Sequence, residues 1–152
     1  DQLIKHWATA ALLPVGSMDV LPGVVELRYC LNDGMAFSML AGKQGLLIGM
    51  TSVMLLAVLI MLFVRKMPLT ERAAWTLVLG GGVGNLIDRV RLGYVVDMLD
   101  TMFMDFPVFN VADVFVVCGT VCALIYYLAF YSKSDEKNWG NKVDGTDPAA
   151  NK

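Results

Sequence analysis

Histidine is nearly missing from this sequence, since His6 is the only one in 152 residues. A Ser-His-Asp triad needs a histidine base, and most catalytic zinc sites need histidine ligands. Both classes of site are therefore nearly excluded. The sequence also lacks a run of lysine or arginine, and its formal net charge is -2. Because a nucleic-acid-binding domain would show a basic face, we expect no nucleic-acid partner.

Cysteines and charged residues are also scarce. The three cysteines, Cys30, Cys118 and Cys122, form neither an even disulfide set nor a Cys-x-x-Cys pair. Charged residues make up only 17% of the chain, whereas hydrophobic residues make up 57%. This is more apolar than a soluble domain of this size needs for its core. The composition therefore favours a membrane protein with one domain.

The sequence contains two long runs without a charged residue. Residues 46–64 form a run of nineteen without a charge, and residues 114–131 form a run of eighteen. About twenty apolar residues cross a bilayer. We predict spanning helices over about 46–64, 73–88 and 110–131. Only about ten apolar residues follow His6, so the first helix is expected to be truncated at its start.

The region between the first two predicted helices has another pattern. Side chains in 24–29 alternate between two faces, as in a strand, and Asn32-Asp33-Gly34 is a turn signal. We therefore predict a small sheet or ribbon outside the membrane. Three basic residues in the 65–72 loop place that loop in the cytoplasm and the ribbon on the outer side. The polar segment 132–152 is expected to be a disordered tail.

Five aspartates lie over 80–113, between the last two predicted helices. Ionisable residues beside membrane spans are costly, which makes them functional candidates. Asp97 and Asp113 are sixteen positions apart, so a folded-back loop could bring them together. In a low-dielectric pocket they would share a proton, and one could activate water while the other donates to a scissile carbonyl. The residues that could orient this pair or hold a substrate are Asn85, Arg89 and Asn110.

Three alternatives remain open from the residues alone. Buried acids paired with Arg89 or Arg91 are weighed equally with catalysis. A transporter or channel subunit could use the same acids, although the sequence shows neither an internal repeat nor paired broken helices. A metal site built from hard oxygen ligands ranks lower, because the spacing matches no loop pattern. Its ligands would be Asp88, Asp97, Asp100 and Asp105.

Four glycines cluster in the third predicted helix, at positions 80, 81, 82 and 84. A phosphate-binding loop is excluded because no Gly-Lys-Ser/Thr follows, and the spacing does not fit a dinucleotide site. In lipid, glycines at a Gly-x-x-x-Gly spacing let another backbone approach closely. We therefore predict that Gly80 and Gly84 bring the third helix against a neighbour.

Five ordered motifs up to Tyr131 carry a resemblance to a known family. They are Asp1-Gln2 with Lys5, Asn32-x-Gly34-x-Ala36-Phe37-Ser38, Gly80-Gly81-x-x-Gly84-Asn85-Leu86-Ile87-Asp88-Arg89, Gly93-Tyr94-Val95-Val96-Asp97, and Phe109-Asn110-Val111-Ala112-Asp113. In this order they closely resemble lipoprotein signal peptidase, also called signal peptidase II, an intramembrane aspartyl protease family of bacteria.

The resemblance implies an all-α integral membrane protein, a bundle of four transmembrane helices with a small extracytoplasmic β ribbon or cradle. Residues 1–131 would form the membrane-embedded peptidase domain. The enzyme would cleave diacylglyceryl-modified prolipoproteins just before the lipidated cysteine. It would be a multi-pass protein of the bacterial cytoplasmic membrane with its active site on the extracytoplasmic side. The expected partners are this substrate and membrane lipid, the chain is expected to be a monomer, and no metal or organic cofactor is expected.

The resemblance also assigns residue roles. The catalytic dyad would be Asp97 and Asp113. Residues that bind substrate or shape the site would be Asn32, Asn85, Arg89 and Asn110, and structural supports would be Asp1, Lys5, Gly34 and Asp88. Asp100 and Asp105 are then interpreted as ordinary polar residues of the connecting loop.

Two positions depart from the family pattern. Met35 stands where a small residue is usual, and Met98 where an aromatic residue is common. Both are expected beside the site, where they would affect lipid or inhibitor preference more than the chemistry.

Overall fold

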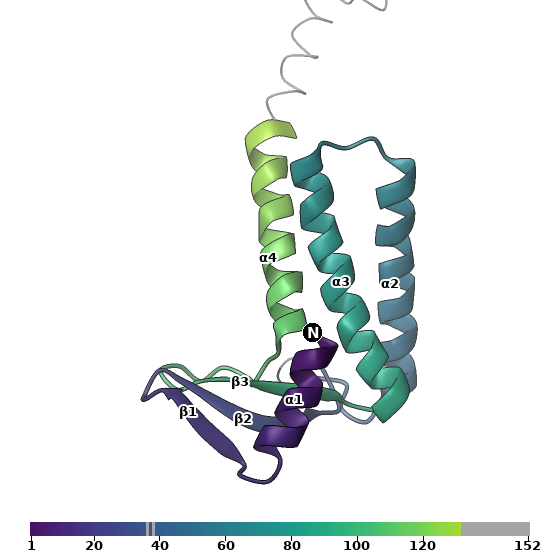
Figure 1. Cartoon of the computed structure of the whole chain (residues 1–152). Helices are drawn as coiled ribbons and strands as arrows, with labels where there is room; N and C mark the ends of the chain where they lie inside the picture. The colour runs from purple at the N-terminus through teal and green to yellow at the C-terminus, as the bar shows by residue number, and fades with distance from the viewer. Residues whose placement is uncertain (36, 38, 132–152) are drawn as a thin grey trace, which may run out of the picture.

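The computed structural model describes residues 1–35, 37 and 39–131, so the predicted tail at 132–152 lies outside the described residues. The three long helices stand side by side with α3 in the middle, and a small sheet with a short helix lies at one end of them (Figure 1). The elements in chain order are α1 (Gln2–Leu12), β1 (Ser17–Leu21), β2 (Val25–Asn32), α2 (Gln44–Val64), α3 (Leu69–Leu92), β3 (Val95–Thr101), α4 (Val111–Tyr126) and a terminal π turn, η2 (Tyr127–Tyr131).

Two of the described helices are long and apolar enough to cross a membrane, namely Gln44–Val64 and Val111–Ala129. They coincide with the predicted 46–64 and 110–131 spans. Their large apolar side chains face outward; Phe63 of α2, for example, is 83% exposed. Such a continuous apolar surface is costly in water and suited to lipid. The middle helix α3 has 24 residues and carries charged side chains near both ends.

Glycines bring α3 and α4 into direct backbone contact. A Cβ atom at Gly81 would collide with the carbonyl oxygen of Ala112, and one at Gly84 would also meet Ala112. Gly119 of α4 makes the reciprocal close approach to α3. Gly80 faces open space, so the predicted Gly80 contact was wrong. Gly81 and Gly84, three positions apart, share the face that packs against α4.

The sheet is larger than the predicted ribbon. Its three antiparallel strands have the order β1-β2-β3, and Cys30 of β2 pairs in register with Asp97 of β3. A helical protein with a small sheet was predicted and is present, but residues 95–101, expected in the connecting loop, form the third strand of that sheet. The strand shows little alternation because both of its faces are buried. Asp100 belongs to β3, is only 7% exposed and pairs with Arg28 at 2.7 Å, so its assignment as a loop residue was wrong.

Helix α1 covers one face of the sheet and fixes its position. Ala8 and Leu12 of α1 pack with Val96 and Met98 of β3 in the core. Met98 is 1% exposed and, by strand alternation, points away from the face that carries Asp97. The expectation that Met98 lies beside the site was therefore wrong. It is a core residue that joins the sheet to α1.

Candidate active site

Asp97 is held by amide groups from two other elements. Its exposed fraction is 1%. Nδ2 of Asn32, at the end of β2, donates to Oδ2 of Asp97 at 2.9 Å. Nδ2 of Asn110, at the start of α4, donates to Oδ1 at 2.6 Å. Both carboxylate oxygens are thus oriented before any substrate arrives.

Burial dominates the electrostatics of Asp97. Burial raises the pKa of Asp97 to about 6. The hydrogen bonds from Asn32 and Asn110 act in the opposite direction and lower this pKa. The nearby charge of Asp113 raises this pKa further, and Lys5 lowers it. The desolvation cost of the charged form outweighs the amide bonds that favour it.

Asp113 is positioned by the local fold of the chain around the start of α4. Its backbone N–H donates to Oδ1 of Asn110, and the backbone N–H of Asn110 donates to Oδ2 of Asp113, each at 3.0 Å. This reciprocal capping box follows from the three-residue spacing. Nδ2 of Asn85 on α3 donates to Oδ1 of Asp113 at 2.7 Å. The carboxylate therefore lies at the positive end of α4, where the helix dipole favours an anion.

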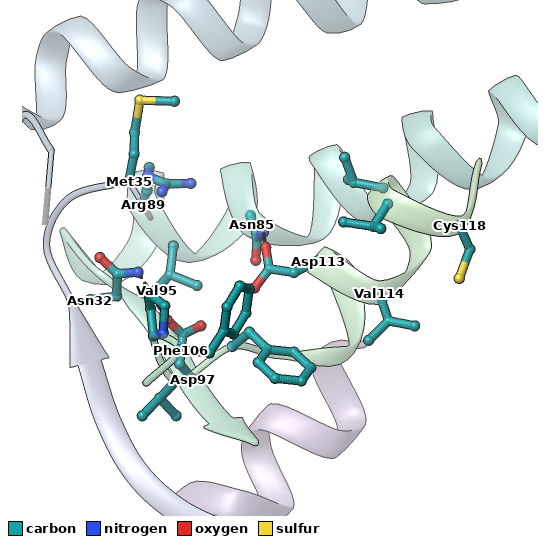
Figure 2. Close-up of a pocket in the computed structure, with 15 residues that line it drawn as sticks. Asn32, Met35, Asn85, Arg89, Val95, Asp97, Phe106, Asp113, Val114 and Cys118 are labelled. Carbon is teal, nitrogen blue, oxygen red and sulfur yellow. Dashed lines mark hydrogen bonds between the residues drawn. The ribbon is translucent and has the colours of Figure 1, made fainter. Parts of the chain in front are cut away.

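Two asparagines connect the two aspartates. Nδ2 of Asn110, which binds Asp97, also donates to Oδ1 of Asn85 at 3.0 Å. Asn85 in turn binds Asp113. Figure 2 shows Asp97 and Asp113 facing a common space, with Asn32 and Asn85 beside them. The fold thus brings together residues from β2, α3, β3 and α4.

A buried lysine of α1 contacts this network through Asn85 and also pairs with two further aspartates. Nζ of Lys5 lies 2.8 Å from Oδ1 of Asn85, 2.9 Å from Asp88 and 3.1 Å from Asp1. Because Lys5 can only donate, Oδ1 of Asn85 must face it, which turns the amide nitrogen toward Asp113. The expected Asp1–Lys5 ion pair is present. Asp88 also accepts from the backbone N–H of Val96 at 3.2 Å, which ties α3 to β3.

Gln2 belongs to the same group of contacts between α1 and α3 as Lys5. Sequence reasoning gave this residue no separate role. Nε2 of Gln2 donates to Oδ1 of Asp88 at 2.7 Å and to the carbonyl oxygen of Gly84 at 3.0 Å. The signal for it was its place beside Asp1 in the first motif. Oδ1 of Asp1 accepts from the backbone N–H of Ala112 at 3.1 Å, so α1 binds both α3 and α4.

Arg89 faces the site without an ion pair to an aspartate among the residues that the structure describes. Its Nη2 donates to the carbonyl oxygen of Gly34 at 2.9 Å, and the N–H of Gly34 donates to Asn32. Nε of Arg89 is buried and has no partner within the described chain. The alternative in which Arg89 neutralises the acids is not supported, because the cations paired with buried aspartates in the described residues are Lys5 and Arg28.

The aspartates open onto a cavity of about 450 Å³ whose walls are mostly apolar. A second, similarly apolar cavity of about 310 Å³ lies between α2, α3 and α4 and also reaches Asp113. Met35 lines both, in agreement with its expected place beside the site. The predicted site residues that line the larger cavity are Asn32, Asn85, Arg89, Asp97 and Asp113, while Asn110 is fully buried behind it.

Phe106 is a lining residue that sequence reasoning missed. Its ring packs edge-on against Phe37 at 6.2 Å and against Phe109 at 5.7 Å. Figure 2 shows it beside Asp97, and both residues line the larger cavity. The only sequence signal was an aromatic residue before Pro107 in the acidic stretch.

The four aspartates of the metal alternative do not share a site. Asp88 binds Lys5, Asp100 binds Arg28 and Asp97 binds two amides. Over the described ranges, no group of three or more His, Cys, Asp or Glu side chains is arranged to hold a metal ion. These residues therefore give the metal alternative no geometric support.

The chain is similar to known proteins over most of its length. Residues 1–129 match the family described as signal peptidase (SPase) II. The lipoprotein signal peptidase of Clostridioides difficile is 42% identical over 88% of this chain and 90% of that protein. That of Enterococcus faecalis is 38% identical over 96% of this chain and 88% of that protein. A bacterial membrane enzyme solved by the in meso method at 2.3 Å resolution shares the fold with a TM-score of 0.80 and 33% identity, covering 88% of this chain and 83% of that one.

Proposed function

The chain belongs to the signal peptidase II family, and from this we propose that it is an aspartic-type membrane endopeptidase that removes signal peptides from diacylglyceryl-modified bacterial prolipoproteins. One observation carries the mechanism: Asp97 and Asp113 face one mostly apolar cavity and are connected through Asn85 and Asn110. Two carboxylates that face one apolar cavity are costly to ionise together, and we propose that one of them carries a proton. An acid and a base are then side by side, as water-mediated peptide cleavage requires.

We assign the shared proton to Asp97, whose pKa burial raises to about 6. Asp113 accepts two N–H bonds at the N-terminus of α4, and we assign it the role of the base. Asp113 takes a proton from water as the water oxygen bonds to the scissile carbonyl carbon, and Asp97 donates to the carbonyl oxygen. When the C–N bond breaks, the leaving nitrogen takes the proton from Asp113 and Asp97 recovers its own. The products are a carboxyl group on the signal peptide and an amino group on the lipidated cysteine.

The surrounding residues have distinct proposed roles. Asn32 and Asn110 orient Asp97, and Asn85 orients Asp113. Arg89 lines the larger cavity, and its guanidinium would donate to a substrate carbonyl there. The structural supports are Asp1, Lys5, Gly34 and Asp88. Lys5 offsets the two buried carboxylates, and Gly34 links Arg89 to Asn32.

We also propose a four-helix, multi-pass topology in the bacterial cytoplasmic membrane, with residues 1–131 as one peptidase domain. Helices α2 and α4 have the length and apolarity of membrane spans; α3 crosses between them, and α1 contributes a short segment at the sheet end. The basic 65–68 loop lies at the opposite end from the sheet (Figure 1). The positive-inside rule then puts the loop in the cytoplasm and the dyad on the extracytoplasmic side.

Separate Asp97→Asn and Asp113→Asn variants test this function in membranes supplied with lipidated prolipoprotein. Each is expected to lower cleavage by about 1,000-fold or more, since each loses a proton-transfer group. Asp19→Asn, an exposed change on β1, is the matched control and should cleave normally. Full cleavage by either dyad variant would contradict the assignment. Cation flux through liposomes without peptide cleavage would favour a transporter, and loss of cleavage on chelation would favour a metal site.

A further inference from the structure

We propose that a polar cavity on the sheet side of Asp97 binds the first residues of the mature lipoprotein, those that follow the lipidated cysteine, and that it favours basic over acidic side chains there. The proposal rests on the proposed function. The cavity has a volume of about 390 Å³ and lies between β2 and the 105–108 segment. It shares Asp97 with the larger apolar cavity, so a substrate chain passing the dyad can enter both.

The cavity extends along β2 away from the dyad. Arg28, Cys30 and Asn32 all line it. Asn32 marks the dyad end, because it donates to Asp97. Arg28 lies four strand residues further, about 13 Å at the usual rise of a β-strand. This length accommodates three to four extended substrate residues.

The walls of the cavity differ from those of the other cavities at the site. The two that reach Asp113 are walled mainly by valine, leucine, methionine and phenylalanine side chains. The core of a signal peptide is apolar, and so is a diacylglyceryl group. The mature segment follows the scissile bond and leaves the membrane for the aqueous phase. The polar cavity is the one whose chemistry matches that segment.

The charges around the cavity give the expected preference. Arg28 is already paired with Asp100 at 2.7 Å. Asp33 and Asp105 are exposed cavity-lining residues, and within the described chain neither is in an ion pair. Their two carboxylates therefore leave the cavity with a negative potential. A lysine in the mature segment would be attracted and a glutamate repelled.

Synthetic diacylglyceryl-modified peptides that differ only at the second and third residues after the cleavage point test the proposal. Lysine, glutamine and glutamate versions are compared with full-length enzyme in lipid. We expect kcat/KM for the lysine version to exceed that for the glutamate version by roughly three- to tenfold, since exposed charge pairs are individually weak. Raising the salt concentration should reduce this ratio.

The Asp33→Asn/Asp105→Asn double variant should bring the lysine-to-glutamate ratio close to one. The matched control, Asp19→Asn, removes the same kind of charge from β1 and should keep the wild-type ratio. Equal cleavage of both versions by the wild type, or an unchanged ratio in the double variant, would overturn the proposal. The glutamine version separates the two failures, because loss of its cleavage by the wild type would refute the proposed function itself.

Discussion

Nδ2 of Asn110 donates to Oδ1 of Asp97 across 2.6 Å, although the two residues are 13 positions apart and belong to different elements. Asn110 also caps α4 through its side-chain oxygen and binds Asp113 through its backbone N–H. One residue therefore orients both carboxylates with different atoms. Its capping function and its bond to Asp97 can be separated by substitution.

Asn110→Ser keeps a side-chain oxygen that caps a helix well but removes the amide donor to Asp97. We expect kcat to fall by about 100-fold, because a small displacement of a reacting group has an effect of this size. The helical circular dichroism signal should stay unchanged. Asn110→Ala removes the cap as well, so it should lose about 1 kcal/mol more stability without a comparable further loss of kcat. A wild-type kcat for Asn110→Ser would show that the bond to Asp97 does not position the acid.

The pH dependence of cleavage reports the proton on Asp97. Burial raises the pKa of Asp97 to about 6, and the proposed mechanism needs this group protonated. We therefore expect kcat/KM to fall above pH 6, approaching tenfold per pH unit. The bond from Asn32 lowers this pKa, so Asn32→Ala should move the falling limb to higher pH.

The control for this shift is Cys30→Ala. Cys30 lies opposite Asp97 in the sheet register and donates no hydrogen bond to it in the described structure. The limb should stay in place in this variant, as measured by initial rates across pH 4 to 8 in one lipid preparation. A limb that moves to lower pH in Asn32→Ala would mean that the amide does not stabilise the ionised form of Asp97.

The apolar helices and several local contacts were predictable because they depend on neighbouring residues. Lipid selects long uncharged runs, which gave α2 and α4 their approximate positions. The Asp1–Lys5 pair depends only on helical spacing. From the residues alone, the meeting of Asp97 and Asp113 was one of several open alternatives, and the resemblance favoured it. Spacing could not decide because the meeting depends on how β3 packs against α3 and α4.

The features that were missed depend on contacts that spacing does not determine. β3 is buried on both faces, so its sequence lacks the alternation that indicates a strand. Asp100 resembled a loop residue because its partner, Arg28, is on another strand. Met98 was placed beside the site because the face of a strand is unknown until the strand itself is predicted.

Lys5→Met should strongly destabilise the protein. The substitution leaves the carboxylates of Asp1 and Asp88, both more than nine-tenths buried, without their cation. Removal of one partner of a buried ion pair costs about 3–5 kcal/mol. Thermal unfolding in detergent should show this loss, whereas Lys43→Met, at an exposed position, should change stability by less than about 0.5 kcal/mol.

A second substitution separates charge from packing in this test. Asp88→Asn combined with Lys5→Met removes one of the two buried carboxylate charges that Lys5→Met leaves without a cation. The double variant should therefore be more stable than Lys5→Met alone, and the difference is measured as a coupling free energy in a double-mutant cycle. A Lys5→Met protein as stable as the wild type would mean that the buried carboxylates do not need this cation.

Gly81→Ala and Gly80→Ala form a matched pair that tests how α3 meets α4. The two glycines are adjacent in one helix, but a Cβ atom at Gly81 would collide with the carbonyl oxygen of Ala112, while one at Gly80 would meet open space. Gly81→Ala should cost about 1–3 kcal/mol by overpacking. It should also lower cleavage, because separating the helices pulls Asn85 away from Asp113. Gly80→Ala should be neutral or stabilise by up to about 1 kcal/mol, since alanine favours helix more than glycine does. Thermal unfolding and cleavage rates measured together decide the matter: equal effects of the two substitutions would show that Gly81 does not set the distance between the helices that carry the dyad.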